Sequence, residues 1–240
     1  YNRLMEMRPD YGYRNYKEII DFNNYDLDGV FKLSLKKNTS VLLISIKQLI
    51  EHSPLPTMKG AKHKVNHIMI SPDGKSFIFM HRWLSKSGKR YDRLLVSDTN
   101  GEFFKIISDG GMVSHCCWKD NCTVVGYLRH NSIDGFYKIN IDTGGIELFS
   151  SELKEFGDGH PTFQSNYMVF DSYPDRSRMK KLYIYDGRND KVKLIGEFLE
   201  PFKFYNQTRC DLHPRFNSDL SSVYIDSVHT GKRTLYKISL

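Results

Sequence analysis

Short runs of alternating apolar and polar residues, separated by polar turns, recur along the chain. The clearest example is residues 67–81, in which two apolar runs flank the turn Ser-Pro-Asp-Gly. A period of two is typical of half-buried β-strands. Units of the same kind begin at His115, His160 and His213, at intervals of 45 to 53 residues. The chain is therefore expected to consist of repeated pairs of strands.

Two further strands are expected after most of these pairs, separated by turns rich in Gly, Asn and Thr. A similar outer pair follows Asp28 and Gly29 near the start. Four antiparallel strands per repeat are typical of a β-propeller blade. The predicted outer strands are 30–35, 41–46, 93–97, 103–107, 137–141, 146–149, 182–185 and 192–195.

The predicted fold is all-β: one β-propeller domain over residues 1–240, with about five four-stranded antiparallel blades or part-blades. The first unit lacks a clear inner strand and the last lacks a fourth strand. We therefore expect further N-terminal blades to be missing; a complete five-bladed ring with an exposed edge is the alternative. Short helices are predicted over 46–51 and 151–156. The expected blades span about 1–55, 62–108, 112–150, 158–198 and 205–240.

The recurrent histidines occupy the same place in each repeat. His67, His115, His160 and His213 all begin the innermost strand of a predicted blade. Because inner strands line the central channel of a propeller, four imidazoles are expected to converge at one mouth of it. Imidazole ligates transition metals and acts as a base near neutral pH. The alternative is structural, since WD40 repeats carry a repeating His that supports the fold by hydrogen bonding.

The segment before the last blade is dense in potential ligands. It contains Gln207, Arg209, Asp211 and His213 within seven residues, and on a strand Asp211 and His213 would point to the same face. His160, which follows an Asp-Gly turn, would reach the same cation from the neighbouring blade. Such a set suits Mn, Fe, Ni or Zn better than Ca. A turn or capping carboxylate is the alternative for Asp211.

Four other side chains are candidates for the same channel mouth. Arg93 opens the third strand of its blade, and His81 ends a second strand in Met-His-Arg-Trp. Arg8 and Tyr13 belong to an aromatic and basic loop, Arg-Pro-Asp-Tyr-Gly-Tyr, which would stack on a sugar ring and pair with its acid group. The alternatives are a surface Arg paired with a nearby Asp, and a turn with packed tyrosines.

Composition narrows the choice of partner. The 240 residues are 40% hydrophobic and 26% charged, with a net charge of +7 that favours anionic partners. No basic tract or motif points to nucleic acid. No apolar run approaches the roughly 20 residues of a membrane span. The four cysteines form no Cys-x-x-Cys pair, which favours a reducing compartment, and a cytoplasmic location is expected.

Several local motifs resemble those of oligogalacturonate lyases and, more loosely, ulvan lyases. The segment Ser-His115-Cys-Cys-Trp is similar to their Thr-His-x-x-Trp, whose His is the catalytic base. Asp-Arg93-Leu-Leu, with Gly101 eight residues after the Arg, is similar to the strand that carries their catalytic Arg. His160 follows His115 by 45 residues, as their first metal-ligating His follows the base.

The last blade carries the rest of the resemblance and its departures. His213-Pro, with Gly-Lys-Arg-x-Leu-Tyr236 downstream, is similar to the family's last blade, where the other metal ligands lie. The family has Gln-x-x-His-x-His-Pro there. Asp211 replaces the first His of that pattern, and Gln207 lies one residue farther upstream. The resemblance therefore implies a metal site with an altered ligand set.

Taken with the residues, the resemblance implies part of a seven-bladed ring that cleaves an acidic, uronate-containing oligosaccharide by metal-assisted β-elimination. His115 is the expected base, and Arg93 the residue that neutralises the carboxylate. The alternatives are a non-catalytic glycan-binding propeller and a protein-interaction scaffold of the TolB or WD40 kind. The implied ion is Mn, held by His160, Gln207, Asp211 and His213, and the implied sugar contacts are Arg8, Tyr13, His67, His81 and Arg209.

Overall fold

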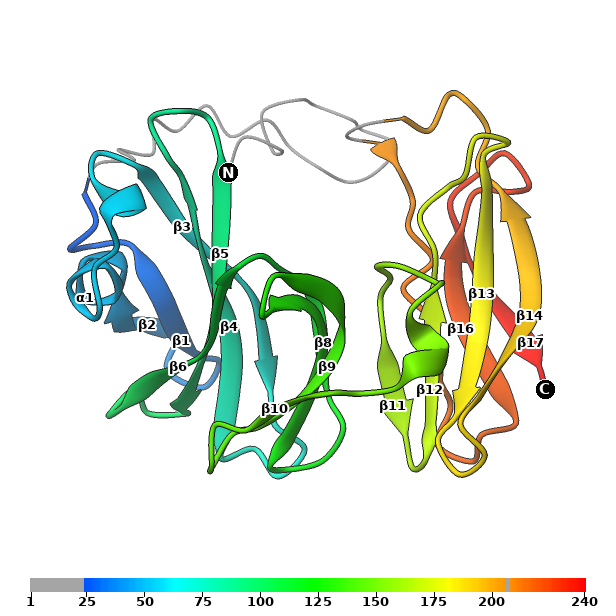
Figure 1. Ribbon diagram of the computed structural model, residues 1–240, viewed down its shortest axis with the longest axis horizontal. Helices are drawn as coiled ribbons and strands as arrows, with labels where there is room; N and C mark the ends of the chain where they lie inside the picture. Colours follow the sequence, from blue (N-terminus) through cyan, green and yellow to red (C-terminus); the bar gives the residue numbers. More distant parts are fainter. Residues whose placement is uncertain (1–23, 206–207) are drawn as a thin grey trace.

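Antiparallel strands form five sheets that follow one another in chain order in the computed structural model (Figure 1). The structure describes residues 24–205 and 208–240. The first sheet pairs β1 (Gly29–Ser34) with β2 (Thr39–Ser45). The second contains β3 (Lys62–Ile70), β4 (Ser76–Leu84), β5 (Arg90–Asp98) and β6 (Phe104–Gly111).

The other three sheets continue the same pattern. The third contains β7 (Val113–Trp118), β8 (Thr123–His130), β9 (Ile133–Asn140) and β10 (Ile146–Leu148). The fourth contains β11 (Thr162–Gln164), β12 (Tyr167–Asp171), β13 (Met179–Asp186) and β14 (Lys191–Leu199). The fifth contains β15 (Arg215–Phe216), β16 (Ser222–Ser227) and β17 (Thr234–Ser239). The predicted all-β propeller of four-stranded antiparallel blades is confirmed.

The core lies between the sheets, because each middle strand buries both of its faces. On β4, Ile78 and Met80 pack into a cluster with residues of β8 and β9. Their neighbours Phe77 and Phe79 point the other way and pack with Val30 of the first sheet. Successive side chains on a strand face opposite sides of the sheet, so one strand supplies two inter-blade cores. The blades are thereby stacked face to face around an axis.

The two short helices predicted between blades differ in length. The helix α1 (Ile46–Glu51) forms as expected, because Ser45 and Gln48 make a reciprocal capping box at its start. The segment from Ser151 forms only a 3₁₀ turn, η4 (Ser151–Leu153). A second 3₁₀ turn, η3 (Pro56–Met58), precedes β3. Within the part of the chain that is described, no helix is long and apolar enough to span a bilayer.

The inner strands bring distant parts of the chain together. β3, β7, β11 and β15 are the edge strands of their sheets, and β11 lies beside both β7 and β15. A hydrogen bond of 3.0 Å from the indole Nε1 of Trp118 to the Met69 carbonyl links β7 to β3. His160 and His213 lie two residues before the starts of β11 and β15, and His115 is the third residue of β7. His67 lies inside β3 and not at its start as expected, because β3 begins earlier, at Lys62.

Candidate functional site: a four-histidine cavity

Four histidines line one cavity of about 460 Å³ at the inner strands. The ring centroids of neighbours are 5.7 Å apart for His67 and His115, 4.0 Å for His115 and His160, and 4.1 Å for His160 and His213. Side chains from four blades, spread over almost 150 residues of sequence, thus form one continuous row. The expected convergence of the repeated histidines is present in the structure.

The backbone at these histidines departs from regular strand geometry. The β3–β4 register shifts between Asn66 and Met69, and the β7–β8 register shifts between Val113 and Cys116. Such bulges redirect side chains that would otherwise point across the sheet. His67 and His213 also adopt positive φ, at 54° and 43°. This conformation costs about 1–3 kcal/mol for a residue with a Cβ and persists only where the surroundings hold it.

His115 is oriented by a carboxylate from the next blade. Its Nδ1 lies 3.1 Å from Oδ1 of Asp158, whose Oδ2 accepts a 2.5 Å hydrogen bond from the Ser114 hydroxyl. The proton on Nδ1 is assigned from this bond. Nε2 then carries the lone pair, and within the described residues no hydrogen bond engages it. A ring nitrogen of this kind can accept a proton from a molecule in the cavity.

His160 is oriented in the same way by Asp171. Its Nδ1 lies 2.8 Å from Asp171 Oδ1, and its backbone N–H donates to the same oxygen at 2.7 Å. Burial opposes protonation of His160, but the hydrogen bond and charge of Asp171 raise its pKa overall. With the proton on Nδ1, Nε2 remains available as a metal ligand. A carboxylate behind a histidine is the usual support for a ligating imidazole.

His160, Asp211 and His213 form a set that fits one transition-metal ion. Their ligand atoms all lie within 4.8 Å of one another. Two ligands on opposite sides of an ion at about 2.1 Å are about 4 Å apart, so binding an ion would draw these side chains slightly closer together. Two imidazoles and one carboxylate suit Mn, Fe or Zn. Cys116 also lines the cavity, but burial raises its pKa to about 12. In the absence of a metal ion it therefore stays a thiol at neutral pH, and it does not belong to the His160, Asp211 and His213 group.

Asp211 already has a cationic partner. Its two oxygens accept hydrogen bonds of 2.7 and 2.8 Å from Arg209, whose guanidinium also lies 4.8 Å from the centre of the Tyr173 ring. Burial opposes ionisation of Asp211, yet the hydrogen bonds and charge of Arg209 lower its pKa overall. A carboxylate offers about four lone-pair positions. Asp211 can therefore keep Arg209 and still contact an ion.

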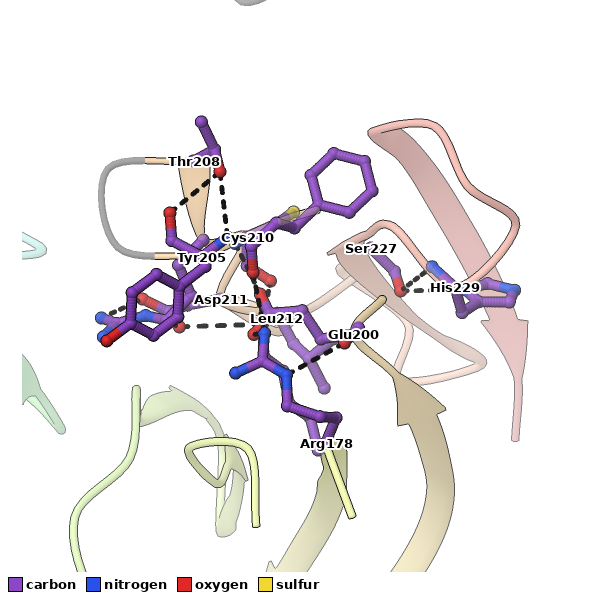
Figure 2. Close-up of polar contacts among 12 residues, drawn as sticks. Arg178, Glu200, Tyr205, Thr208, Cys210, Asp211, Leu212, Ser227 and His229 are labelled. Atoms are coloured by element: carbon purple, nitrogen blue, oxygen red, sulfur yellow. Dashed lines mark hydrogen bonds and ion pairs between the residues drawn. The ribbon is translucent and has the colours of Figure 1, made fainter. Parts of the chain in front are cut away.

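The loop that carries Asp211 is held by buried charges (Figure 2). Glu200 accepts a 2.9 Å hydrogen bond from the backbone N–H of Cys210, one residue before Asp211. The same oxygen accepts from Lys180 at 2.6 Å, and Lys180 also donates to the Cys210 carbonyl. Arg178 donates to Glu200 at 2.7 Å and to the Phe204 carbonyl at 2.8 Å. The loop is thereby fixed although it contains little regular secondary structure.

Gly159 explains the turn before His160. A Cβ at this position would lie 1.9 Å from the carbonyl oxygen of Asp171. Only glycine therefore lets the backbone pass so close to the end of β12. The sequence suggested a tight turn that exposes His160; in the structure the turn is pressed against Asp171 and the His160 side chain is only 12% exposed. Of the two residues that flank this glycine, His160 lines the cavity and Asp158 bonds to His115.

Two of the sequence-predicted site residues lie elsewhere. Arg93 is only 1% exposed, and its guanidinium donates to His81 Nδ1 at 3.1 Å, to the Ser53 carbonyl at 3.1 Å and to the Leu49 carbonyl. His81 is fully buried and also lies 2.9 Å from His63. The alternation of β4 and β5 turns both side chains into the space beside α1. The expectation that Arg93 and His81 face the cavity is therefore corrected.

The remaining predicted residues fall into three groups. His67, His115, His160 and His213 line the cavity. Asp211 joins the ligand set, while Arg209 stands behind it, stacked on Tyr173. The predicted Arg8, Tyr13 and Gln207 lie outside the described residues.

Sequence reasoning missed three residues of the site. Asp158 and Asp171 orient His115 and His160, and Arg215 is the one Lys or Arg among the cavity-lining residues within 24–205 and 208–240. In the sequence, Asp171 directly follows the apolar run Tyr-Met-Val-Phe, a position at which a solvent-exposed charge is not expected. Asp158 was visible only as part of a turn, and Arg215 only as the residue after His213-Pro.

Comparisons with known proteins define the fold. No family profile matches the sequence, and no curated protein matches it significantly. Among solved structures, an oligogalacturonate lyase in complex with manganese has a TM-score of 0.50 at 13% identity, over 88% of this chain and 71% of that chain. The tricorn protease has a TM-score of 0.54 at 11% identity, over 87% of this chain and 23% of that chain.

The β-propeller domain of the Trilobed protease from Pyrococcus furiosus has a TM-score of 0.50 at 13% identity, over 87% of this chain and 60% of that chain. Proteins of different activity therefore share the architecture, and identities this low carry the fold alone. The chain is similar to all three in being a β-propeller with blades of antiparallel strands around a central axis.

Proposed function

We propose that the four-histidine cavity is the active site of a lyase that cleaves a uronate-containing oligosaccharide by metal-assisted β-elimination. The observation that carries the proposal is the placement of His115. Its unengaged Nε2 belongs to a ring 4.0 Å from His160, the first member of the His160, Asp211 and His213 set. A base next to a cation site is the arrangement that removal of a weakly acidic proton requires.

The reacting proton is the one on C5, next to the sugar carboxylate. Nε2 of His115 accepts this proton, and the electron pair of the C5–H bond forms the C4–C5 double bond. The C4–O bond breaks, the leaving oxygen takes a proton from water, and the hydroxide so formed removes the proton from the His115 imidazolium, which restores the base. Asp158 holds the imidazole with Nδ1 protonated, which keeps Nε2 basic and stabilises the imidazolium that forms. A divalent ion held by His160, Asp211 and His213 would neutralise the sugar carboxylate as negative charge develops.

Arg215 takes the carboxylate-binding role that the resemblance assigned to Arg93. It begins β15 two residues after His213, lines the cavity and has a side chain that is 59% exposed. Its ion pair with Asp226 is long, at 3.9 Å. A guanidinium can pair with a carboxylate through two parallel hydrogen bonds. The net charge of +7 would aid capture of an anionic sugar.

A non-catalytic glycan-binding propeller is the second candidate. It is favoured by the pairing of both Asp211 oxygens with Arg209, which competes with a metal ion for the carboxylate. Such a protein would use Arg215 and the same cavity to bind the acidic sugar without breaking it. The two candidates share a ligand and differ only in the product.

The test is an assay of the full chain with oligogalacturonate, followed through the ultraviolet absorbance of the unsaturated product. We expect product to form with Mn²⁺, to stop with a chelator and to return when Mn²⁺ is restored. The matched control substrate is an oligomer of the neutral hexose, which lacks the carboxylate and is expected to remain intact. Saturable binding without product would select the second candidate. Neither product nor binding with any uronate oligomer, with or without divalent metal, would remove both.

A further inference from the structure

One buried carboxylate joins the two segments that carry the candidate metal ligands: the segment of His160, and the segment of Asp211 and His213. Asp171, at the end of β12, is 1% exposed. Its Oδ1 accepts from the backbone N–H and Nδ1 of His160, at 2.7 and 2.8 Å. Its Oδ2 accepts from the backbone N–H groups of Leu212 and His213, at 3.0 and 3.2 Å. Four donors from segments some 50 residues apart thus meet on one side chain.

These bonds hold a strained conformation. His213 adopts a φ of 43°, which a residue with a Cβ rarely takes. A conformation of this kind persists where neighbouring groups over-determine it. The N–H of His213 is bound by Asp171, and the Leu212 carbonyl accepts a 2.8 Å hydrogen bond from the N–H of Asp226 on β16. Without Asp171 the strained turn would lose two of its anchors at once.

The segment of Asp211 and His213 is anchored on both sides of Asp211. Before it, the backbone N–H of Cys210 is bound by Glu200 and its carbonyl by Lys180. After it, Leu212 is bound by Asp171. Of the two ligand-carrying segments, Glu200 and Lys180 bind only the one with Asp211. Asp171 binds that segment and also His160. Among these anchors, Asp171 is therefore the one that contacts both His160 and the backbone of His213.

We propose that Asp171 is a positioning residue that locks His160 and His213 into one ligand geometry and fixes the His160 tautomer with its lone pair toward the cavity. The inference rests on the proposed function only where it invokes a metal ion. The locking itself is a property of the protein alone. It can be tested separately, with the full chain in the absence of metal.

The metal-free test is nuclear magnetic resonance of the protein labelled with ¹⁵N. In the wild type we expect His160 to carry its proton on Nδ1 and the amides of Leu212 and His213 to exchange slowly. In Asp171→Asn, an NH₂ group replaces one acceptor, so the tautomer should become mixed and these two amides should exchange at least about tenfold faster. A wild-type His160 protonated on Nε2, or an unchanged Asp171→Asn spectrum, would overturn the proposal, and the first of these needs no variant to fold.

The metal test is calorimetric titration with Mn²⁺ alone. We expect Asp171→Asn to weaken binding by about 10–100-fold. The matched control is Asp92→Asn, which removes an equally buried carboxylate, 1% exposed and paired with Arg82, from another blade. It should bind Mn²⁺ within about threefold of the wild type. Equal affinity of the Asp171→Asn protein and the wild type would overturn the positioning role. A wild type that binds no Mn²⁺ but shows the expected spectra would instead overturn the metal site of the proposed function.

Discussion

Two clusters of histidines in this chain show how the same residue types serve opposite purposes. In the closed cluster (His63, His81 and Arg93), every ring nitrogen has a partner. Arg93 donates to His81 Nδ1, so His81 Nε2 carries the proton and donates to His63 Nδ1 at 2.9 Å, which leaves His63 Nε2 to donate to the Met58 carbonyl at 3.4 Å. All hydrogen-bonding capacity of the two rings is used inside the protein.

In the open cluster (His67, His115, His160 and His213), each oriented ring keeps one nitrogen for the cavity. His115 and His160 are each tied through Nδ1 to a carboxylate. Within the described residues, no hydrogen bond engages their Nε2 atoms. A satisfied histidine stabilises the fold, whereas a half-satisfied histidine beside a cavity is available to a ligand. The role of a histidine in this protein therefore depends on which of its ring nitrogens are hydrogen-bonded, and not on its recurrence along the chain.

Exchanging one histidine in each cluster should separate activity from stability. We expect His115→Gln to lower lyase activity by about 10²–10⁴-fold and to change the free energy of unfolding by less than about 1 kcal/mol. We expect His81→Leu to lower the free energy of unfolding by about 3 kcal/mol, because it leaves the buried Nε of Arg93 and Nδ1 of His63 without a partner. Urea denaturation and the lyase assay measure the two effects. The contrast would fail if His115→Gln kept full activity.

Mild acid should destabilise the protein through the closed cluster. Burial and the neighbouring Arg93 lower the pKa of His81 to about 2 from the ordinary value of 6.5. The unfolded chain therefore takes up a proton first, so the stabilisation is complete above pH 6.5 and is lost as the pH falls toward the folded pKa. The expected loss from His81 is about 2 kcal/mol at pH 5.

Urea denaturation at pH 7 and pH 5 measures this loss. The His81→Leu variant is the control, and its free energy of unfolding should change less with pH than that of the wild type. Parallel curves for the two proteins would show that His81 is not kept neutral by the fold.

The two arginines provide the smallest but most specific contrast. Arg215 faces the cavity and is 59% exposed, whereas Arg93 is buried in the closed cluster. We expect Arg215→Gln to raise the Kd for a uronate oligomer about tenfold, from the loss of one charge-assisted pair. Its free energy of unfolding should stay within about 0.5 kcal/mol of the wild type.

Arg93→Gln is the matched variant and should show the reverse pattern. Its uronate affinity should stay within about twofold of the wild type, and its free energy of unfolding should fall, because the carbonyls of Leu49 and Ser53 lose their donor. Equal losses of affinity in the two variants would return Arg93 to the binding site.

Much of the architecture follows from local pattern. The alternation around Ser71–Gly74 and the repeats that begin at His115, His160 and His213 predicted antiparallel pairs, and the strands form where the alternation is regular. The capping pair Ser45 and Gln48 likewise marks the start of α1 within its own few residues. Such features depend on backbone conformation and on which face of a strand is apolar, and both are written in neighbouring residues.

The roles of individual polar side chains were decided by tertiary structure. His81 and His115 occur in similar alternating runs, yet one is closed off by Arg93 and the other is left open beside Asp158. Asp171 binds His213 across some 40 residues of sequence, a contact that no local pattern encodes. Sequence alone thus determined the blades and the alignment of their histidines, because strand periodicity is local. Only the packing of one blade on the next decided which ring nitrogens remain free, because hydrogen-bond partners are chosen by proximity in space.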